Sequence, residues 1–239
     1  MTFDAAFWTA LGQIIGVNII LSGDNAVVIA LACRNLPEKY RNKAIFAGSA
    51  GAIILRVVFS IVVVELMTFP YLKLIGGLLL LWIGVKLIVP EAEHGDGVEG
   101  ASSLWGAIRT VVIADAVMSL DNVIAIAAAA RGNFALLVIG LAISIPLIIV
   151  GSQLILKILV RYPVLVVAGG GLLGWIAGEV IVTDPSIEHW VDANAAWMHF
   201  WSKPIGAGVV ILIGKLLARR QAAQAHEVED LAQKGGGER

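Results

Sequence analysis

Long runs of apolar residues follow one another along this chain, separated by short segments that carry most of its charged residues. Each run is long enough to cross a hydrocarbon core of about 30 Å as a helix. The pattern predicts an all-α membrane protein with seven transmembrane helices, at residues 8–33, 44–67, 70–89, 104–130, 135–159, 164–183 and 195–218. Six helices remain an alternative, because the apolar part of the last run is short and begins after Lys203-Pro204.

Basic residues favour one side of the membrane. Arg34, Lys39, Arg41 and Lys43 follow the first predicted helix. Lys157 and Arg161 lie at the junction of the fifth and sixth helices, and Arg219 and Arg220 follow the seventh. Because cytoplasmic loops carry the excess of Lys and Arg, this pattern predicts an N-terminus outside and a C-terminus in the cytoplasm. The acidic, glycine-rich residues 90–103 are then a flexible cytoplasmic linker, and residues 219–239 a cytoplasmic tail.

The composition narrows the class of protein further. Hydrophobic residues make up 59% of the 239 residues and charged residues 15%, and the mean hydropathy of +0.88 lies outside the range of soluble domains. A net charge of -1 gives no basic surplus for binding nucleic acid. Cys33 is the single cysteine, which excludes an internal disulfide and a cysteine-rich metal site. The sequence lacks a phosphate-binding loop, HExxH and a nucleophile elbow, so we expect no enzymatic activity.

The chain contains an internal repeat. Residues 22–35 (SGDNAVVIALACRN) align with residues 119–132 (SLDNVIAIAAAARG) at an offset of 97, with seven of fourteen positions identical. Residues 76–89 align in the same way with residues 169–182, which brings Trp82 into register with Trp175. Helices one to three (8–89) are therefore predicted to repeat as helices four to six (104–183). Because three is odd, the second copy has inverted topology, an architecture typical of transporters.

Polar residues gather at equivalent positions of predicted helices one and four: Asn18, Ser22, Asp24, Asn25, Asp115, Ser119, Asp121 and Asn122. In each helix, three of these residues recur at i, i+4 and i+7 and share one face. Asp24 and Asp121 point about 120° away from that face, at 100° per residue. Either they face a different neighbour or the helix is locally unwound, which Gly23 favours in the first half more than Leu120 does in the second.

Each intramembrane carboxylate costs about 2.5–3.5 kcal/mol on insertion scales, so it needs a partner or a function. The Asn and Ser residues alone can equally be interhelical hydrogen-bond groups without further function. Arg56, near the middle of predicted helix two, is interpreted as a structural counter-ion to one of the aspartates in preference to a substrate contact.

The chemistry of these side chains favours a hard cation. Carboxylate, amide and hydroxyl oxygens without His or Cys suit Mn²⁺, Ca²⁺ or Mg²⁺ better than Zn²⁺ or Cu⁺. Asp24 and Asp115 are predicted on the cytoplasmic side of the membrane midplane, and Asn18 and Asp121 on the outer side, because the two helices run in opposite directions. The inner level would therefore hold two carboxylates and bind the cation more strongly. No permanently bound cofactor is expected.

The segments LSGDNAVVIALACRN and DAVMSLDNVIAIAAAARG resemble the TerC family of integral membrane proteins, named for tellurium resistance. The resemblance covers residues 8–218 and looks like the small bacterial branch. It implies a place in the bacterial inner membrane, an association with manganese export and with the supply of metal to exported enzymes, and a metal-binding role for Asp24, Asn25, Asp121 and Asn122.

We therefore expect a transporter that exports a divalent cation, with Mn²⁺ first and Ca²⁺ or Mg²⁺ as alternatives, through a midplane site between helices one and four. The alternative is a membrane assembly or partner-binding protein that supports metalation or secretion of exported proteins without itself transporting. A third interpretation, an organic-solute exporter, would place Arg56 at the centre of the site. A homo-oligomer and contact with the secretion machinery both stay open as partners.

Overall fold

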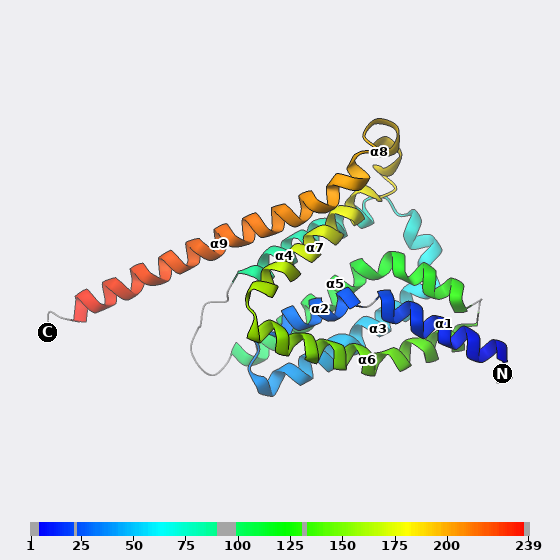
Figure 1. The fold of residues 1–239 in the computed structure, drawn as a ribbon, viewed down its shortest axis with the longest axis horizontal. Helices are drawn as coiled ribbons and strands as arrows, with labels where there is room; N and C mark the ends of the chain where they lie inside the picture. Colours follow the sequence, from blue (N-terminus) through cyan, green and yellow to red (C-terminus); the bar gives the residue numbers. More distant parts are fainter. Residues whose placement is uncertain (1–4, 22, 90–98, 131–132, 237–239) are drawn as a thin grey trace.

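The computed structural model describes residues 5–21, 23–89, 99–130 and 133–236, and within these ranges every regular element is a helix. Figure 1 shows their arrangement. In chain order the helices are α1 (Ala5–Leu21), α2 (Gly23–Cys33), α3 (Glu38–Thr68), α4 (Leu72–Ile88), α5 (Glu99–Ala130), α6 (Phe134–Arg161), α7 (Val164–Val182), α8 (Glu188–Asn194) and α9 (Met198–Gly236). The expectation of an all-α protein is confirmed for this part of the chain.

Among the described residues, four helical segments are long and apolar enough to cross a membrane, namely Glu38–Val62, Ala135–Arg161, Val164–Val182 and Met198–Gln224. The first of them ends where Val62 departs from helical geometry, with φ -113° and ψ 16°. The predicted first helix, residues 8–33, is divided into α1 and α2. The chain is therefore an all-α membrane protein, whereas the count of seven spans and the inverted repeat remain predictions. α5 begins at Glu99, inside the segment that was expected to be a flexible linker.

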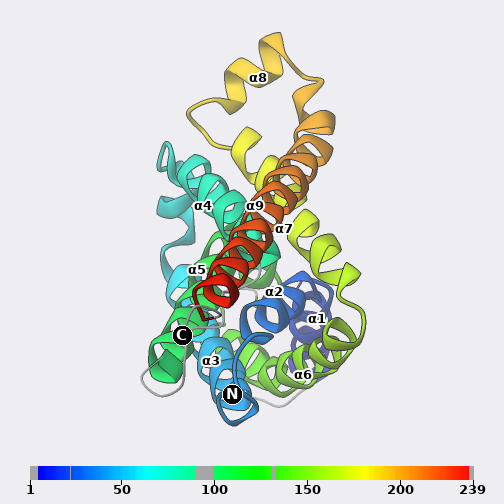
Figure 2. The ribbon, with the colours of Figure 1, turned by 90° about the vertical axis from the view of Figure 1, so that its left-hand side faces the viewer.

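The helices pack in two groups that share α2 and α5. In one group α3 lies against α5, and α6 lies against α1 and α2; in the other, α4 lies against α7, and α9 covers both. Figures 1 and 2 show α9 running along α4 and α7 and then extending beyond the bundle. Two hydrophobic cores fill these groups, one around Ile14, Leu31 and Ile45 and the other around Leu80 and Leu173.

Glycines let α7 approach its neighbours closely. A Cβ atom on Gly174 or Gly178 would collide with the α9 backbone at Gly206 or Ser202. On the other side of α7, a Cβ on Gly170 would lie 3.2 Å from the carbonyl oxygen of Gly84 in α4. Small residues are how membrane helices gain close van der Waals contact without a hydrophobic driving force between them. The glycine-rich stretch 169–174 is therefore a close-packing face of α7.

One buried carboxylate fixes the end of the α4–α7 pair. Asp184, in the turn after α7, accepts hydrogen bonds from the backbone N–H groups of Tyr71 (3.0 Å) and Leu74 (2.9 Å) at the start of α4, and from the N–H and hydroxyl of Ser186. Tyr71 has φ 67°, a left-handed conformation that is unfavourable for a bulky residue and needs such support. Burial raises the pKa of Asp184, but the hydrogen bonds from Ser186, Leu74 and Tyr71 outweigh it, and the pKa is lowered overall.

Candidate functional site

The two repeated motifs differ in backbone structure. In the first, α1 ends at Leu21 and α2 begins at Gly23, so the helix is interrupted within the Ser-Gly-Asp-Asn segment. In the second, α5 runs without interruption from Glu99 to Ala130. Glycine tolerates the backbone conformations that an interruption requires, whereas leucine is a strong helix former. That Gly23 supplies this freedom stays a prediction, because Ser22, the residue between α1 and α2, lies outside the described residues.

The hydrogen bonds at the interruption have been rearranged. In a continuous helix the carbonyl of Leu21 would accept from the N–H of residue 25. Here the Asn25 N–H donates to the Asp24 carboxylate instead (2.8 Å), and the Leu21 carbonyl accepts from the side-chain amide of Asn122 (3.2 Å). Asn122 belongs to α5, so a motif residue of the second half replaces the hydrogen bond that the first half has lost.

Arg56 and Asp115 form a buried ion pair beside this interruption. The Nη2 atom of Arg56 in α3 lies 2.7 Å from Oδ1 of Asp115 in α5, and the two residues are 1% and 5% exposed. Ser119, one turn further along α5, accepts from Arg56 Nε (3.1 Å) and donates to Asp115 Oδ2 (3.0 Å). A buried charge that gains both an opposite charge and further hydrogen bonds offsets much of its desolvation cost. The interpretation of Arg56 as a counter-ion to an aspartate is confirmed, and Asp115 is the partner.

Asn25 stands out because its side chain is buried and unsatisfied. It is 2% exposed, and neither Nδ2 nor Oδ1 has a hydrogen-bond partner within the described part of the chain. Such an amide costs about 1–3 kcal/mol for each group left unpaired. The neighbouring Asp24 is half-buried in the first turn of α2, where the positive end of a helix dipole favours a carboxylate. Asp24 also lies within electrostatic range of Asp115 and Arg56.

The comparisons with known proteins give the family. The model described as "Integral membrane protein TerC family" matches residues 3–223. The chain belongs to the TerC family. No solved structure matches it.

Relatives within the TerC family share the membrane location but do not identify a substrate. One, "Uncharacterized membrane protein YjbE" of Bacillus subtilis, is 47% identical over 175 residues, which is 73% of this chain and 80% of the relative. "Uncharacterized membrane protein YceF" of the same organism is 31% identical over 147 residues, 58% of this chain and 57% of the relative. "UPF0053 inner membrane protein YgdQ" of Escherichia coli is 31% identical over 138 residues, 51% of this chain and 58% of the relative. The chain is therefore an integral, multi-pass membrane protein.

The structure brings some of the predicted site residues together in this TerC family chain. Asp24 and Asn25 lie at the interruption, Asn122 reaches it from α5, and Asp115 and Ser119 are joined to Arg56. Ser22 and the side chains of Asn18 and Asp121 lie outside the described residues. Among the residues that are described, no group of three or more His, Cys, Asp or Glu could hold a metal ion.

The ion pair changes one part of the electrostatic expectation. The prediction of a richer inner level counted Asp24 and Asp115 as two negative charges. Arg56 compensates the charge of Asp115, so only one of the two carboxylates contributes an uncompensated charge at this level. Sequence reasoning also missed the Leu21 carbonyl as a polar group of the site, because a backbone carbonyl becomes available only when the helix is interrupted.

Proposed function

We propose that this chain is a membrane transporter that binds a divalent cation, with Mn²⁺ as the substrate, at the α1–α2 interruption where it faces α5. The observation that carries the proposal is the buried, unpaired amide of Asn25 next to the Asp24 carboxylate. Together they offer hard oxygen atoms at membrane depth, which Mn²⁺, Ca²⁺ and Mg²⁺ prefer. The association with manganese export that the resemblance of the two motifs implies favours Mn²⁺ among the three.

An interrupted helix suits this task. Transporter sites commonly lie where a membrane helix is discontinuous, because freed carbonyl groups and helix ends can face the ion. Gly23 adds access, since a Cβ atom placed there would meet nothing within 4 Å in the described part of the chain. The ion pair between Arg56 and Asp115 is consistent with a cation site, because it gives Arg56 a structural role that does not require contact with a substrate. The organic-solute interpretation therefore has no observation in its favour.

Two sets of contacts support the proposed inverted repeat. Residues 48–60 align with residues 140–152 at an offset of 92, with six of thirteen positions identical. Gly48 of α3 then corresponds to Gly140 of α6, and at the motif offset of 97, Ile14 corresponds to Val111. A Cβ on Gly48 would press against Val111, and a Cβ on Gly140 would press against Ile14. Exchanging the two halves thus converts one contact into the other, as a pseudo-two-fold axis in the membrane plane requires.

The same exchange relates the α4 and α7 contacts. At the offset of 93, Gly77 corresponds to Gly170, and Gly84 to Ala177. A Cβ on Gly77 would lie 3.0 Å from the Ala177 carbonyl oxygen, and one on Gly84 would lie 3.2 Å from that of Gly170. Two halves of this kind can exchange roles, and we propose that they expose the site alternately to the cytoplasm and the outside, with export as the net direction and the N-terminus outside.

Metal analysis of the purified protein tests the proposed site. The wild-type protein should retain Mn²⁺ after dialysis and bind it in a calorimetric titration, whereas the Asp24→Asn/Asp121→Asn double variant should not. Glu179→Gln is the matched control, because Glu179 is an exposed carboxylate paired with Lys203 at 2.6 Å and lies away from both motifs. Equal Mn²⁺ binding by all three folded proteins would remove the motif aspartates from the site. Absence of Mn²⁺ binding in all three, with the same partners captured from membranes, would favour an assembly protein.

A further inference from the structure

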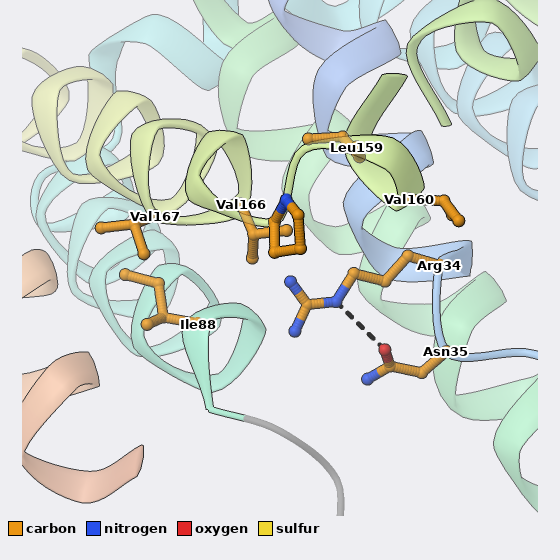
Figure 3. Close-up of a pocket in the computed structure, with 8 residues that line it drawn as sticks. Arg34, Asn35, Ile88, Leu159, Val160, Val166 and Val167 are labelled. Carbon is orange, nitrogen blue, oxygen red and sulfur yellow. Dashed lines mark hydrogen bonds between the residues drawn. The ribbon is translucent and has the colours of Figure 1, made fainter. Parts of the chain in front are cut away.

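A second site lies at the opposite end of α2 from the Ser-Gly-Asp-Asn segment, where four helices end or begin. The pocket has a volume of about 320 Å³ and lies between the turn after α2, the end of α4, the end of α6 and the start of α7. Its walls include Ile88, Leu159, Pro163, Val166 and Val167, which are apolar, and its polar groups come from Arg34 and Asn35. Figure 3 shows the Arg34 side chain pointing from the end of α2 toward α4 and α7.

Hydrogen bonds connect Arg34 and its turn to neighbouring residues. Its Nε atom donates to the Asn35 side-chain oxygen (3.1 Å), drawn as the dashed line in Figure 3. Arg41, at the start of α3, holds the same turn by donating to the backbone carbonyls of Arg34 (3.2 Å) and Leu36 (2.8 Å). A guanidinium group presented in this way against apolar walls suits an anion, and its planar fork matches the oxygens of a phosphate group.

The pocket also lies where membrane-length helices end, which is the level expected for phospholipid headgroups. The membrane-length segment of α6 ends at Arg161, and that of α7 begins at Val164; both residues lie directly beside the pocket. Exposed Tyr162 has the Arg161 guanidinium 5.9 Å from its ring centre, and such aromatic and basic residues mark membrane–water interfaces. Val160 and Val164 leave exposed apolar surface next to the pocket, where an acyl chain can lie.

We infer that this pocket binds the phosphate of an anionic phospholipid, with Arg34 as the phosphate contact and the apolar walls against the glycerol and the start of the acyl chains. The volume corresponds to about ten water molecules at roughly 30 Å³ each, which accommodates a phosphate and glycerol but not whole chains. Free phosphate would contact Arg34 but leave the apolar walls without an apolar ligand. Basic pockets between membrane helices are common anionic-lipid sites.

The inferred lipid site is independent of the transport proposal, although both involve α2. This helix begins at the motif with Gly23 and ends at Cys33, next to Arg34. A lipid bound at its end would tie α2 to α4 and α7. The lipid would therefore stabilise the folded protein whether or not Mn²⁺ is transported.

Native mass spectrometry and thermal unfolding of the purified protein in dodecylmaltoside test the inference. Added phosphatidylglycerol should bind the wild-type protein and raise its Tm, and phosphatidylcholine should do neither. Arg34→Gln should weaken phosphatidylglycerol binding on the order of tenfold, the loss of one charge-assisted contact. Arg161→Gln is the matched control, because it removes the same charge at the same end of the bundle but from an exposed side chain that does not line the pocket.

Three results would overturn the inference. Equal phosphatidylglycerol affinity of wild type and Arg34→Gln would show that Arg34 does not hold the lipid, and equal weakening by Arg161→Gln would show only general attraction between charges. If glycerol 3-phosphate or inorganic phosphate raised the Tm as much as phosphatidylglycerol does, the ligand would be a soluble phosphate. If Arg34→Gln does not fold, the phosphatidylglycerol affinities of Arg34→Lys and Arg161→Lys are compared instead. Lysine keeps the positive charge but lacks the planar guanidinium group that binds two phosphate oxygens.

Discussion

The buried pair of Arg56 and Asp115 allows a stability prediction with a control taken from the chain itself. Changing Arg56 to Ile removes the cation and leaves a carboxylate that is 5% exposed without its partner at 2.7 Å. Breaking one side of a buried ion pair costs about 3–5 kcal/mol. Ser119 also loses the donor at 3.1 Å. The single variant should therefore give little folded protein, and Arg56→Lys should give more than Arg56→Ala.

The proposed repeat supplies the compensating change. Arg56 corresponds to Ile148 at the offset of 92, and Asp115 corresponds to Asn18 at the offset of 97. The double variant Arg56→Ile/Asp115→Asn therefore copies the neutral pair of residues at the equivalent positions. Replacing both members of a buried ion pair by well-packed neutral residues is often neutral or stabilising. We expect the double variant to recover most of the folded yield that Arg56→Ile loses.

The assay is a thermodynamic cycle measured by size-exclusion yield and thermal unfolding in detergent. The two single variants and the double variant together give the coupling free energy between the residues. A coupling of about 3 kcal/mol is expected from the cost of leaving one charge unpaired. The role of Arg56 as a structural counter-ion would be refuted if the stability changes of the two single variants simply added up in the double variant. It would also be refuted if Arg56→Ile gave as much folded protein as wild type.

Three further predictions concern the helix interruption, the helix packing and the Asp184 turn. Asn122→Leu removes the donor to the Leu21 carbonyl and should lower the free energy of unfolding by about 1–3 kcal/mol; an unchanged Tm would contradict this. Gly206→Val should separate α9 from α7 and lower the folded yield, whereas Gly208→Val should not, because a Cβ on Gly208 meets nothing within 4 Å among the described residues. Asp184→Ala should cost about 1–3 kcal/mol. The pKa of Asp184 is lower in the folded state than its ordinary value of 3.8. The carboxylate therefore stabilises the fold fully above pH 3.8, and this stabilisation is lost as the pH falls through the folded-state pKa. The Tm difference between wild type and Asp184→Ala should accordingly shrink only in acid.

The sequence predicted the features that depend on local chemistry. Gly23 and Leu120 differ in backbone freedom, and that difference favoured local unwinding in the first motif over the second; the chain has two helices, α1 and α2, at the first motif and one, α5, at the second. The cost of burying Arg56 predicted that it would pair with an aspartate. It did not predict which one, because the register between α3 and α5 depends on packing contacts such as that between Gly48 and Val111.

Other features depend on residues that are distant in the chain. Asp184 lies in a polar turn without any periodic pattern, and it bonds to backbone groups more than 100 positions away. Nothing in the composition of that turn indicates a partner at the start of α4. The pocket at Arg34 likewise forms only where the ends of four helices meet. Tertiary contacts of this kind follow from the packing of whole helices, which a single sequence does not specify.

Manganese flux in proteoliposomes tests the central claim most directly. Purified wild type, Asp24→Asn and the control Glu179→Gln are reconstituted at equal density, a Mn²⁺ gradient is imposed, and entry is followed by quenching of an enclosed dye. Wild type and Glu179→Gln should carry Mn²⁺ at the same rate. The Mn²⁺ flux through Asp24→Asn should fall at least about tenfold, since the change removes a charged ligand of the proposed site in the first turn of α2. Wild-type flux through folded Asp24→Asn, or no flux through any of the three proteins, would contradict the account.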